Sequence, residues 1–256
     1  MPVVADASSL ALVGGAALAA GIVNAIAGGG SLITFPALVA IGFPSVIASA
    51  INTVALCPGY FGATVAQRRD LVGQGTRARR ILPAAAAGGV AGALLLLHTR
   101  ESVFSQIVPW LILLAVTLLA LGDTLRRWLV GRSHDPHAET WAALPVGLAA
   151  IYGGYFGAGV GIMVLASCAI IVDDTLTRLN ALKQSASLVI NVAAAIVFVA
   201  IAPLDWTVIV VMAVCALAGG AIGGAIASRV PARVLKWTVV TGGTILGLVY
   251  LVRNYS

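Results

Sequence analysis

The stretch Asn24-Ala-Ile-Ala-Gly-Gly-Gly-Ser-Leu-Ile-Thr34 places three consecutive glycines, Gly28, Gly29 and Gly30, inside an apolar run. The second half of the chain contains a similar stretch, Gly154-Tyr-Phe-Gly-Ala-Gly-Val-Gly-Ile-Met-Val164. Glycine weakens a helix and permits positive φ, so each stretch predicts a break between two helices. Helix breaks at corresponding places in two related halves are typical of the binding sites of membrane carriers.

Other pairs of short motifs correspond in the same way. Asn52-Thr53 falls opposite Lys183-Gln184, and the glycines at 88–92 fall opposite those at 219–224. Small residues four apart allow helix backbones to approach closely, which indicates a packed helix bundle. The sequence therefore predicts two homologous repeats, residues 1–132 and residues 133–256, each with membrane-spanning helices.

The composition decides the class of protein. Charged residues make up 9% of the chain and hydrophobic residues 60%, and the mean hydropathy is +1.04. A soluble protein has about 25% charged residues, so this chain predicts an all-α polytopic membrane protein in contact with the lipid bilayer. We expect no enzyme activity, and we read the net charge of +6 as membrane topology, not as a nucleic-acid interface.

Ten apolar segments are expected, and most reach the roughly 20 residues that a transmembrane helix needs. Segments 31–42 and 160–172 are much shorter, and each directly follows a glycine break. The expected segments are 9–27, 31–42, 46–66, 79–98, 105–125, 141–156, 160–172, 176–201, 206–227 and 234–252.

Basic residues predict the orientation. The loops at 68–80, 126–132 and 229–236 hold eleven of the fifteen Lys and Arg residues, so the positive-inside rule places all three loops in the cytoplasm. Ten crossings would make the two repeats inverted relative to one another. Eight crossings, with the short segments returning to their own side, would make them parallel. We favour the inverted repeat because the parallel arrangement would place the loop at 229–236 outside.

Lys183 is the most informative candidate for a binding site. It lies inside the segment 176–201, next to Gln184 and two turns before Asn191. A charged side chain in a bilayer is costly, so Lys183 is expected to face the bundle interior or a wet cavity. The alternative is that its ammonium group reaches back to the cytoplasmic headgroups.

The first half is neutral at the corresponding position, where it has Asn52 and Thr53, while Asn24 and Ser31 flank its break. Each polar residue alone is equally consistent with a helix–helix hydrogen bond. Together they suit a small anion, because backbone N–H groups at the start of a helix favour negative charge. The glycines expected to expose such groups are Gly29, Gly30, Gly159 and Gly161.

No metal or cofactor is predicted. The three cysteines, Cys57, Cys168 and Cys215, lie in apolar segments without paired spacing. The glycines at 157–161 follow no strand and are not a nucleotide-binding fingerprint. No acidic residue lies deep in an apolar segment, so proton coupling has no evident carboxylate; Asp173, Asp174 or the anion itself would have to take the proton.

Two signatures, Gly21-Ile-Val-Asn-Ala-Ile-Ala-Gly-Gly-Gly-Ser-Leu-Ile-Thr-Phe-Pro36 and Tyr152-Gly-Gly-Tyr-Phe-Gly-Ala-Gly-Val-Gly161, resemble the sulfite exporter TauE/SafE family. This family is also called the toluene-sulfonate uptake permeases. The resemblance implies a multi-pass protein of the inner membrane that moves sulfite, sulfonates or other small anions. The chain departs from the family at Thr53, where first halves often have Lys, and at Ala166, which corresponds to Pro36.

The sequence thus predicts a permease or exporter of a small anion, in particular sulfite or an organosulfonate, that works by alternating access between two repeats. An anion channel and a non-transporting membrane component of sulfur metabolism remain alternatives. The direction of transport, the coupling ion and the oligomeric state stay open.

Overall fold

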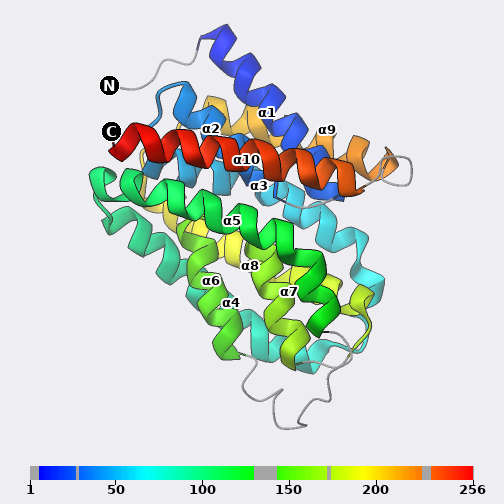
Figure 1. The fold of residues 1–256 in the computed structure, drawn as a ribbon. Helices are drawn as coiled ribbons and strands as arrows, with labels where there is room; N and C mark the ends of the chain where they lie inside the picture. The colour runs from blue at the N-terminus through cyan, green and yellow to red at the C-terminus, as the bar shows by residue number, and fades with distance from the viewer. Residues whose placement is uncertain (1–5, 27–28, 130–142, 172–173, 227–231, 256) are drawn as a thin grey trace.

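The computed structural model describes residues 6–26, 29–129, 143–171, 174–226 and 232–255 (Figure 1). These residues form ten α-helices and one short 3-10 turn, and they contain no strand. The helices are α1 (Ala7–Ile26), α2 (Ser31–Ala40), α3 (Ser45–Ala66), α4 (Gly75–His98), α5 (Glu101–Leu129), α6 (Ala143–Tyr155), α7 (Val160–Ile171), α8 (Leu176–Ile201), α9 (Trp206–Ile226) and α10 (Ala232–Tyr255), with η1 (Arg68–Leu71) between α3 and α4.

The prediction of an all-α polytopic membrane protein is confirmed. Seven of the described helices are long and apolar enough to cross a membrane, namely α1, α3, α4, α5, α8, α9 and α10. Helices α2 and α7 are short, with 10 and 12 residues, as the glycine breaks predicted. Helix α6 is also short, with 13 residues. The number of crossings stays a prediction. Gly28, Asp173, the repeat boundary after residue 132 and Arg229 lie outside the described residues.

Each glycine break forms the turn of a helix hairpin. Helices α6 and α7 lie antiparallel, because Val160 contacts Gly153 near the break and Ser167 Oγ lies 3.4 Å from the carbonyl oxygen of Pro145 further along. In the first half, Gly30 packs against Ala20 in α1, so α2 turns back beside α1. The break therefore bends the chain, and the two helices on either side of it do not form one continuous span.

The connection from α2 to α3 and the connection from α7 to α8 lie near opposite ends of α3. At the start of α3, the carboxylate of Glu101 accepts hydrogen bonds from the backbone N–H groups of Ser45 and Val46, the latter at 3.0 Å. Beyond the other end of α3, the backbone carbonyl of Val72 accepts a hydrogen bond of 3.0 Å from Arg178 in the first turn of α8. The α2–α3 junction and the α7–α8 junction are thus at opposite ends of the bundle (Figure 1).

The helix pairs follow a regular pattern. Helix α1 packs along α9, and α4 packs along α6; α3 also contacts α9, and α8 also contacts α4. Helix α3 packs against α8, and α5 against α10. When α1–α5 are matched in order with α6–α10, the pair α1–α9 corresponds to the pair α6–α4, and α3–α9 corresponds to α8–α4. The pairs α3–α8 and α5–α10 each correspond to themselves. This is the pattern that two similar halves produce when they interlock.

Glycines hold the interlocked helices close together. A Cβ atom on Gly21 would overlap the carbonyl oxygen of Ala216 in α9, and one on Gly219 would overlap the carbonyl oxygen of Leu18 in α1. On the other side, a Cβ on Gly92 would overlap the carbonyl oxygen of Ile151 in α6. The predicted packing role is confirmed for Gly88, Gly92 and Gly219. Gly220 differs from Gly219, because open space lies beside its α-carbon.

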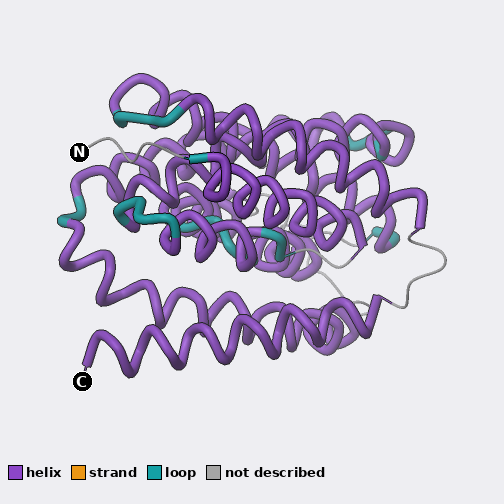
Figure 2. The backbone as a smooth tube through the Cα atoms, turned by 90° about the horizontal axis from the view of Figure 1, so that it is seen from above, coloured by secondary structure: helices purple, strands orange, loops and turns teal. Residues whose placement is uncertain are grey.

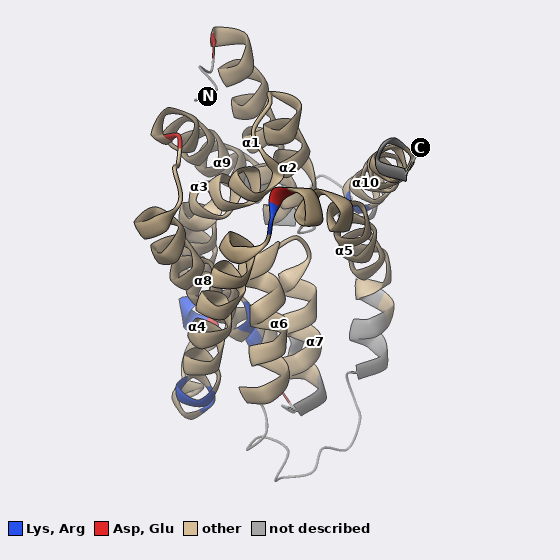
Figure 3. Cartoon of the chain, turned by 90° about the vertical axis from the view of Figure 1, so that its left-hand side faces the viewer, with Lys and Arg blue, Asp and Glu red and all other residues tan. Residues whose placement is uncertain are grey.

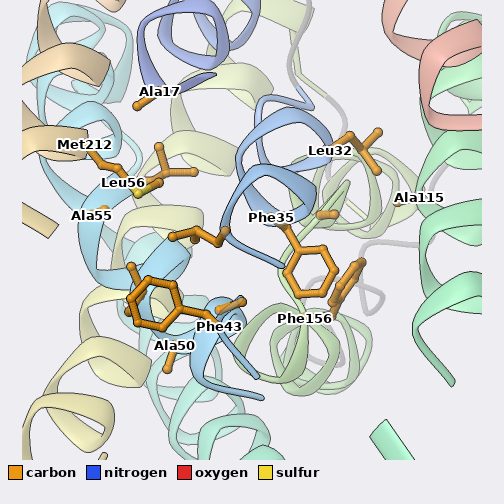
Figure 4. Close-up of a cluster of buried hydrophobic side chains, with 14 of the residues drawn as sticks. Ala17, Leu32, Phe35, Phe43, Ala50, Ala55, Leu56, Ala115, Phe156 and Met212 are labelled. Carbon is orange, nitrogen blue, oxygen red and sulfur yellow. The ribbon is translucent and has the colours of Figure 1, made fainter. Parts of the chain in front are cut away.

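The buried core lies between the hairpins and the remaining helices. The rings of Phe35 in α2 and Phe156 at the second break meet edge to face with centroids 5.2 Å apart (Figure 4). Helices α5 and α10 run side by side along one edge of the bundle (Figure 2). Helix α5 covers both breaks, with Leu119 beside Gly29 and Ala115 beside Gly159.

Candidate functional site

The first break is held by its own polar side chains. Gly29 has φ of +89°, a conformation that other residues rarely adopt. The side-chain oxygen of Asn24 accepts a hydrogen bond of 2.8 Å from the N–H of Gly30 at the start of α2. The buried hydroxyl of Thr34 is shared between the carbonyl oxygen of Gly30 and the side-chain oxygen of Asn52 in α3. These contacts connect α1, α2 and α3 at one point.

Two other predicted residues of the first half, Ser31 and Thr53, are also buried. Ser31 is buried, with 7% of its surface exposed, and it is the first residue of α2. Thr53 is buried next to Asn52, and its hydroxyl donates to the carbonyl oxygen of Ser49 in the same helix at 3.0 Å. The hydroxyl of Thr53 is therefore bonded within α3 in this conformation.

The second break is held by a different group. Gly157 and Gly159 both have φ of +79°. The hydroxyl of Tyr152 donates a hydrogen bond of 2.7 Å to the carbonyl oxygen of Ala158. The N–H groups around the start of α7 bond back to the glycine carbonyls, as in Val160 to Gly157 and in Ile162 and Met163 to Gly159. The N–H of Gly161 makes no such bond to the described backbone of this turn.

The aliphatic part of Lys183 lies across the first turn of α7. A Cβ atom on Gly161 would lie 3.7 Å from Cδ and 3.9 Å from Cε of Lys183. Gly161 therefore leaves the space that the lysine chain occupies. Lys183 is half-buried, as is its neighbour Gln184. Asn191 is buried further along α8, and its amide donates to the carbonyl oxygen of Ser187 at 2.8 Å.

The two breaks differ in which backbone group is satisfied. At the first break a side-chain oxygen takes up an N–H group, that of Gly30. At the second break a side-chain hydroxyl takes up a carbonyl group, that of Ala158. Among residues 160–163, only the N–H of Gly161 makes no backbone hydrogen bond in the described turn, and it lies at the start of a helix, where the helix dipole favours negative charge. It also has Lys183 beside it.

The predicted site residues therefore form two sets. Asn24, Gly30 and Asn52 are joined by hydrogen bonds at the first break, while Lys183 contacts Gly161 at the second. Helices α3 and α8, which carry Asn52 and Lys183, pack against each other. Their assignment to a ligand stays a prediction.

Three residues outside the predicted set prove important for this geometry, namely Thr34, Tyr152 and Ser187. The bonds of Asn24 and Tyr152 both reach a backbone group six residues further along the chain. A polar side chain six residues before a glycine turn is a signal that could have found Tyr152. Ser187 lies four residues after Lys183 on the same helix face, which is the sequence signal that marks it.

A charged cluster ties the two halves together near the start of α8. Asp174 pairs with Arg178 at 3.0 Å and also with Arg77 at the start of α4. Partial burial raises the pKa of Asp174, but hydrogen bonds from Arg178, from the N–H of Thr175 and from Arg77 outweigh it and hold the pKa below its usual value. Segments of the ribbon that carry Lys and Arg, coloured blue, lie around this end of α4 and α8 (Figure 3).

Apolar helices of membrane-spanning length, with two glycine hairpins and buried polar groups at the hairpin turns, define a multi-pass helical membrane protein. Residues 13–250 match the protein family described as "Sulfite exporter TauE/SafE". The chain therefore belongs to the TauE/SafE family, and the resemblance noted in the sequence is confirmed.

Curated relatives of the chain carry transporter names. The "Probable membrane transporter protein YfcA" of Escherichia coli K12 is 26% identical over 207 residues, which cover 81% of this chain and 76% of the relative. The "Probable membrane transporter protein ORF9" of Sinorhizobium sp is 27% identical over 224 residues, covering 86% and 84%. A "Probable membrane transporter protein" of Haemophilus influenzae is 27% identical over 209 residues, covering 80% and 79%. No solved structure matches the chain significantly.

Proposed function

We propose that this protein is a permease or exporter of the inner membrane that moves a small anion, in particular sulfite or an organosulfonate, by alternating access between its two halves. The observation that carries the proposal is the position of Lys183 across the start of α7. There the chain of Lys183 meets a helix N-terminus and the N–H of Gly161, which makes no backbone hydrogen bond within the described turn. This combination favours a small ligand with negative charge.

The inverted repeat is part of the same proposal. The α2–α3 and α7–α8 junctions lie at opposite ends of α3, as the contacts of Glu101 and Arg178 indicate. The helix pairs also exchange when α1–α5 are matched with α6–α10. Both observations support two halves of opposite orientation. Alternating access then requires the halves to adopt two arrangements around one central site.

The family supports the substrate class. The description "Sulfite exporter TauE/SafE" matches nearly the whole chain, and sulfite is a small anion of the kind that the second break favours. The first break carries no cation, since Asn24 and Asn52 are neutral there and are bonded to Gly30 and Thr34. We therefore expect the anion to bind closer to the second break than to the first.

Substitution of Lys183 tests the proposal. A hydrogen bond to a charged group is worth about 1.5–3 kcal/mol, and a ligand of sulfite size makes few contacts, so Lys183→Ala should abolish anion uptake into proteoliposomes. Lys183→Met should do the same while it keeps an aliphatic chain against Gly161. Lys236→Met, which removes a buried cation from α10, is the matched control and should retain uptake.

Unchanged anion uptake by both Lys183 variants would contradict the site assignment. The carrier mechanism has a separate test, because anion on the far side of the membrane accelerates uptake by a carrier through counterflow. Uptake that does not respond to internal anion would indicate a channel instead. If the wild-type protein neither binds nor transports any anion, the result would favour the third alternative, a non-transporting membrane component.

A further inference from the structure

The buried hydroxyl of Ser187 lacks a hydrogen-bond partner among the described residues. Ser187 lies on α8 one turn after Lys183, and none of its surface is exposed. Its hydroxyl oxygen makes no hydrogen bond to the part of the chain that the structure describes. Buried polar groups in folded proteins are nearly always satisfied, so an unsatisfied one calls for an explanation such as a ligand that completes it.

Neighbouring polar residues of α8 show what a purely structural role looks like. Ser185 donates to the carbonyl oxygen of Ala181 at 3.1 Å, which is the usual way for a helical serine to satisfy its hydroxyl. Asn191 donates to the carbonyl oxygen of Ser187 itself. The corresponding acceptor for Ser187 is the carbonyl oxygen of Lys183, and its hydroxyl does not take that bond.

The position of Ser187 places it toward the second break. Residues four apart lie on the same face of a helix, and helical side chains lean toward the N-terminus. The side chain of Ser187 therefore leans along α8 toward Lys183, which crosses α7 at Gly161. The face that these two residues share carries an ammonium group and a hydroxyl, and the start of α7 adds the N–H of Gly161.

We propose that Ser187 is a substrate-contacting residue whose hydroxyl donates a hydrogen bond to an oxygen atom of an oxyanion held beside Lys183 at the start of α7. This inference rests on the proposed function, since it assigns a further contact of the same site. A directional hydroxyl donor favours an anion with oxygen atoms over a halide of equal charge. Ser187 thereby contributes to selectivity, and its complete burial keeps its hydroxyl away from water in this conformation.

Binding measurements on purified protein test the assignment. The dissociation constants of sulfite, sulfoacetate and chloride are measured from the anion-induced shift in melting temperature, for the wild type, Ser187→Ala and Ser185→Ala. Ser187→Ala should bind sulfite or sulfoacetate about tenfold more weakly or worse, with its chloride response unchanged. Ser185→Ala removes a hydroxyl that is already bonded within α8 and should bind like the wild type.

The anion-free protein provides a second readout. Removal of an unsatisfied buried hydroxyl should leave the melting temperature of Ser187→Ala unchanged or raise it, whereas loss of a structural hydrogen bond would lower it. A lowered melting temperature together with unchanged binding of all three anions would overturn the proposal for Ser187. If Lys183→Met loses sulfite binding and Ser187→Ala retains it, the proposed function stands and the Ser187 contact is wrong. If no anion shifts the melting temperature of the wild type, the proposed function and the Ser187 contact are both wrong.

Discussion

Asn24 is a residue whose chemistry is clear only in the folded structure. The sequence predicts that its amide contacts the substrate, which stays a prediction, and the structure shows its side-chain oxygen bonded to the N–H of Gly30. Gly30 is the residue just before α2, and its N–H group has no partner within the helix, so the side-chain oxygen of Asn24 caps this N–H group across the glycine turn. Its role is then to position the break.

Replacement of Asn24 measures this cap. Asn24→Ala leaves the N–H of Gly30 without its partner at a partly buried position, which should lower the free energy of unfolding by about 1–2 kcal/mol. Thr117→Ala removes an exposed hydroxyl that bonds within its own helix and should change stability by less than about 0.5 kcal/mol. Thermal unfolding in detergent compares the two. Equal melting temperatures for both variants would argue against the cap.

At the scale of elements, glycines decide how closely the helices pack. The Gly21 side of α1 meets the backbone of α9, while Gly15 on the same helix has open space beside its α-carbon. The two positions have the same residue type and similar helical surroundings. They differ in whether a neighbouring backbone occupies the place of a Cβ atom.

Two matched substitutions separate packing from helix propensity. Gly21→Ala would force α1 away from the carbonyl of Ala216 and should destabilise the protein by about 1–3 kcal/mol. Gly15→Ala meets nothing within 4 Å and should be neutral or stabilising by up to about 1 kcal/mol, because alanine is the better helix former. Melting temperatures in the same detergent test the pair. If both substitutions lowered the melting temperature, overpacking against α9 would not be the cause of the destabilisation.

Much of this element structure could be predicted from the sequence because it depends on local pattern. Hydropathy and glycine placement predicted ten helices, including the short α2 and α7, and the described helices agree with them. The prediction for the site missed the bond from Tyr152 to Ala158. A tertiary contact such as the position of Lys183 against Gly161 depends on how α7 and α8 pack, which no local pattern contains.

At the scale of the whole molecule, a polar network joins the halves at one end. Asp174, just before α8, bonds Arg77 of the first half and Arg178 of its own half. Asn180 adds a hydrogen bond of 2.8 Å to Gln67, just after α3. These bonds hold the segment between α3 and α4 against the start of α8, close to the helix that carries Lys183.

The network predicts a specific pH dependence. The pKa of Asp174 is lower in the folded protein than in the unfolded chain, so the carboxylate stabilises the fold above its unfolded pKa of about 3.9. That contribution is lost as the pH falls through the lowered folded value. The difference in melting temperature between the wild type and Asp174→Asn should therefore be constant near neutral pH and shrink in acid. A difference that grows in acid would contradict this assignment.

The interlocked pairing of helices bears on how such a chain could have arisen. Helix α1 packs on α9 and α4 on α6, so each of these close glycine contacts takes one helix from each half. A half-length ancestor would have exposed both glycine faces and could have buried them only against a second copy of itself. If the halves have the opposite orientation that we propose, those two copies would have been inserted in opposite directions. Gene fusion would then have joined an existing antiparallel dimer and freed each half to diverge, one acquiring Lys183 and the other Asn52.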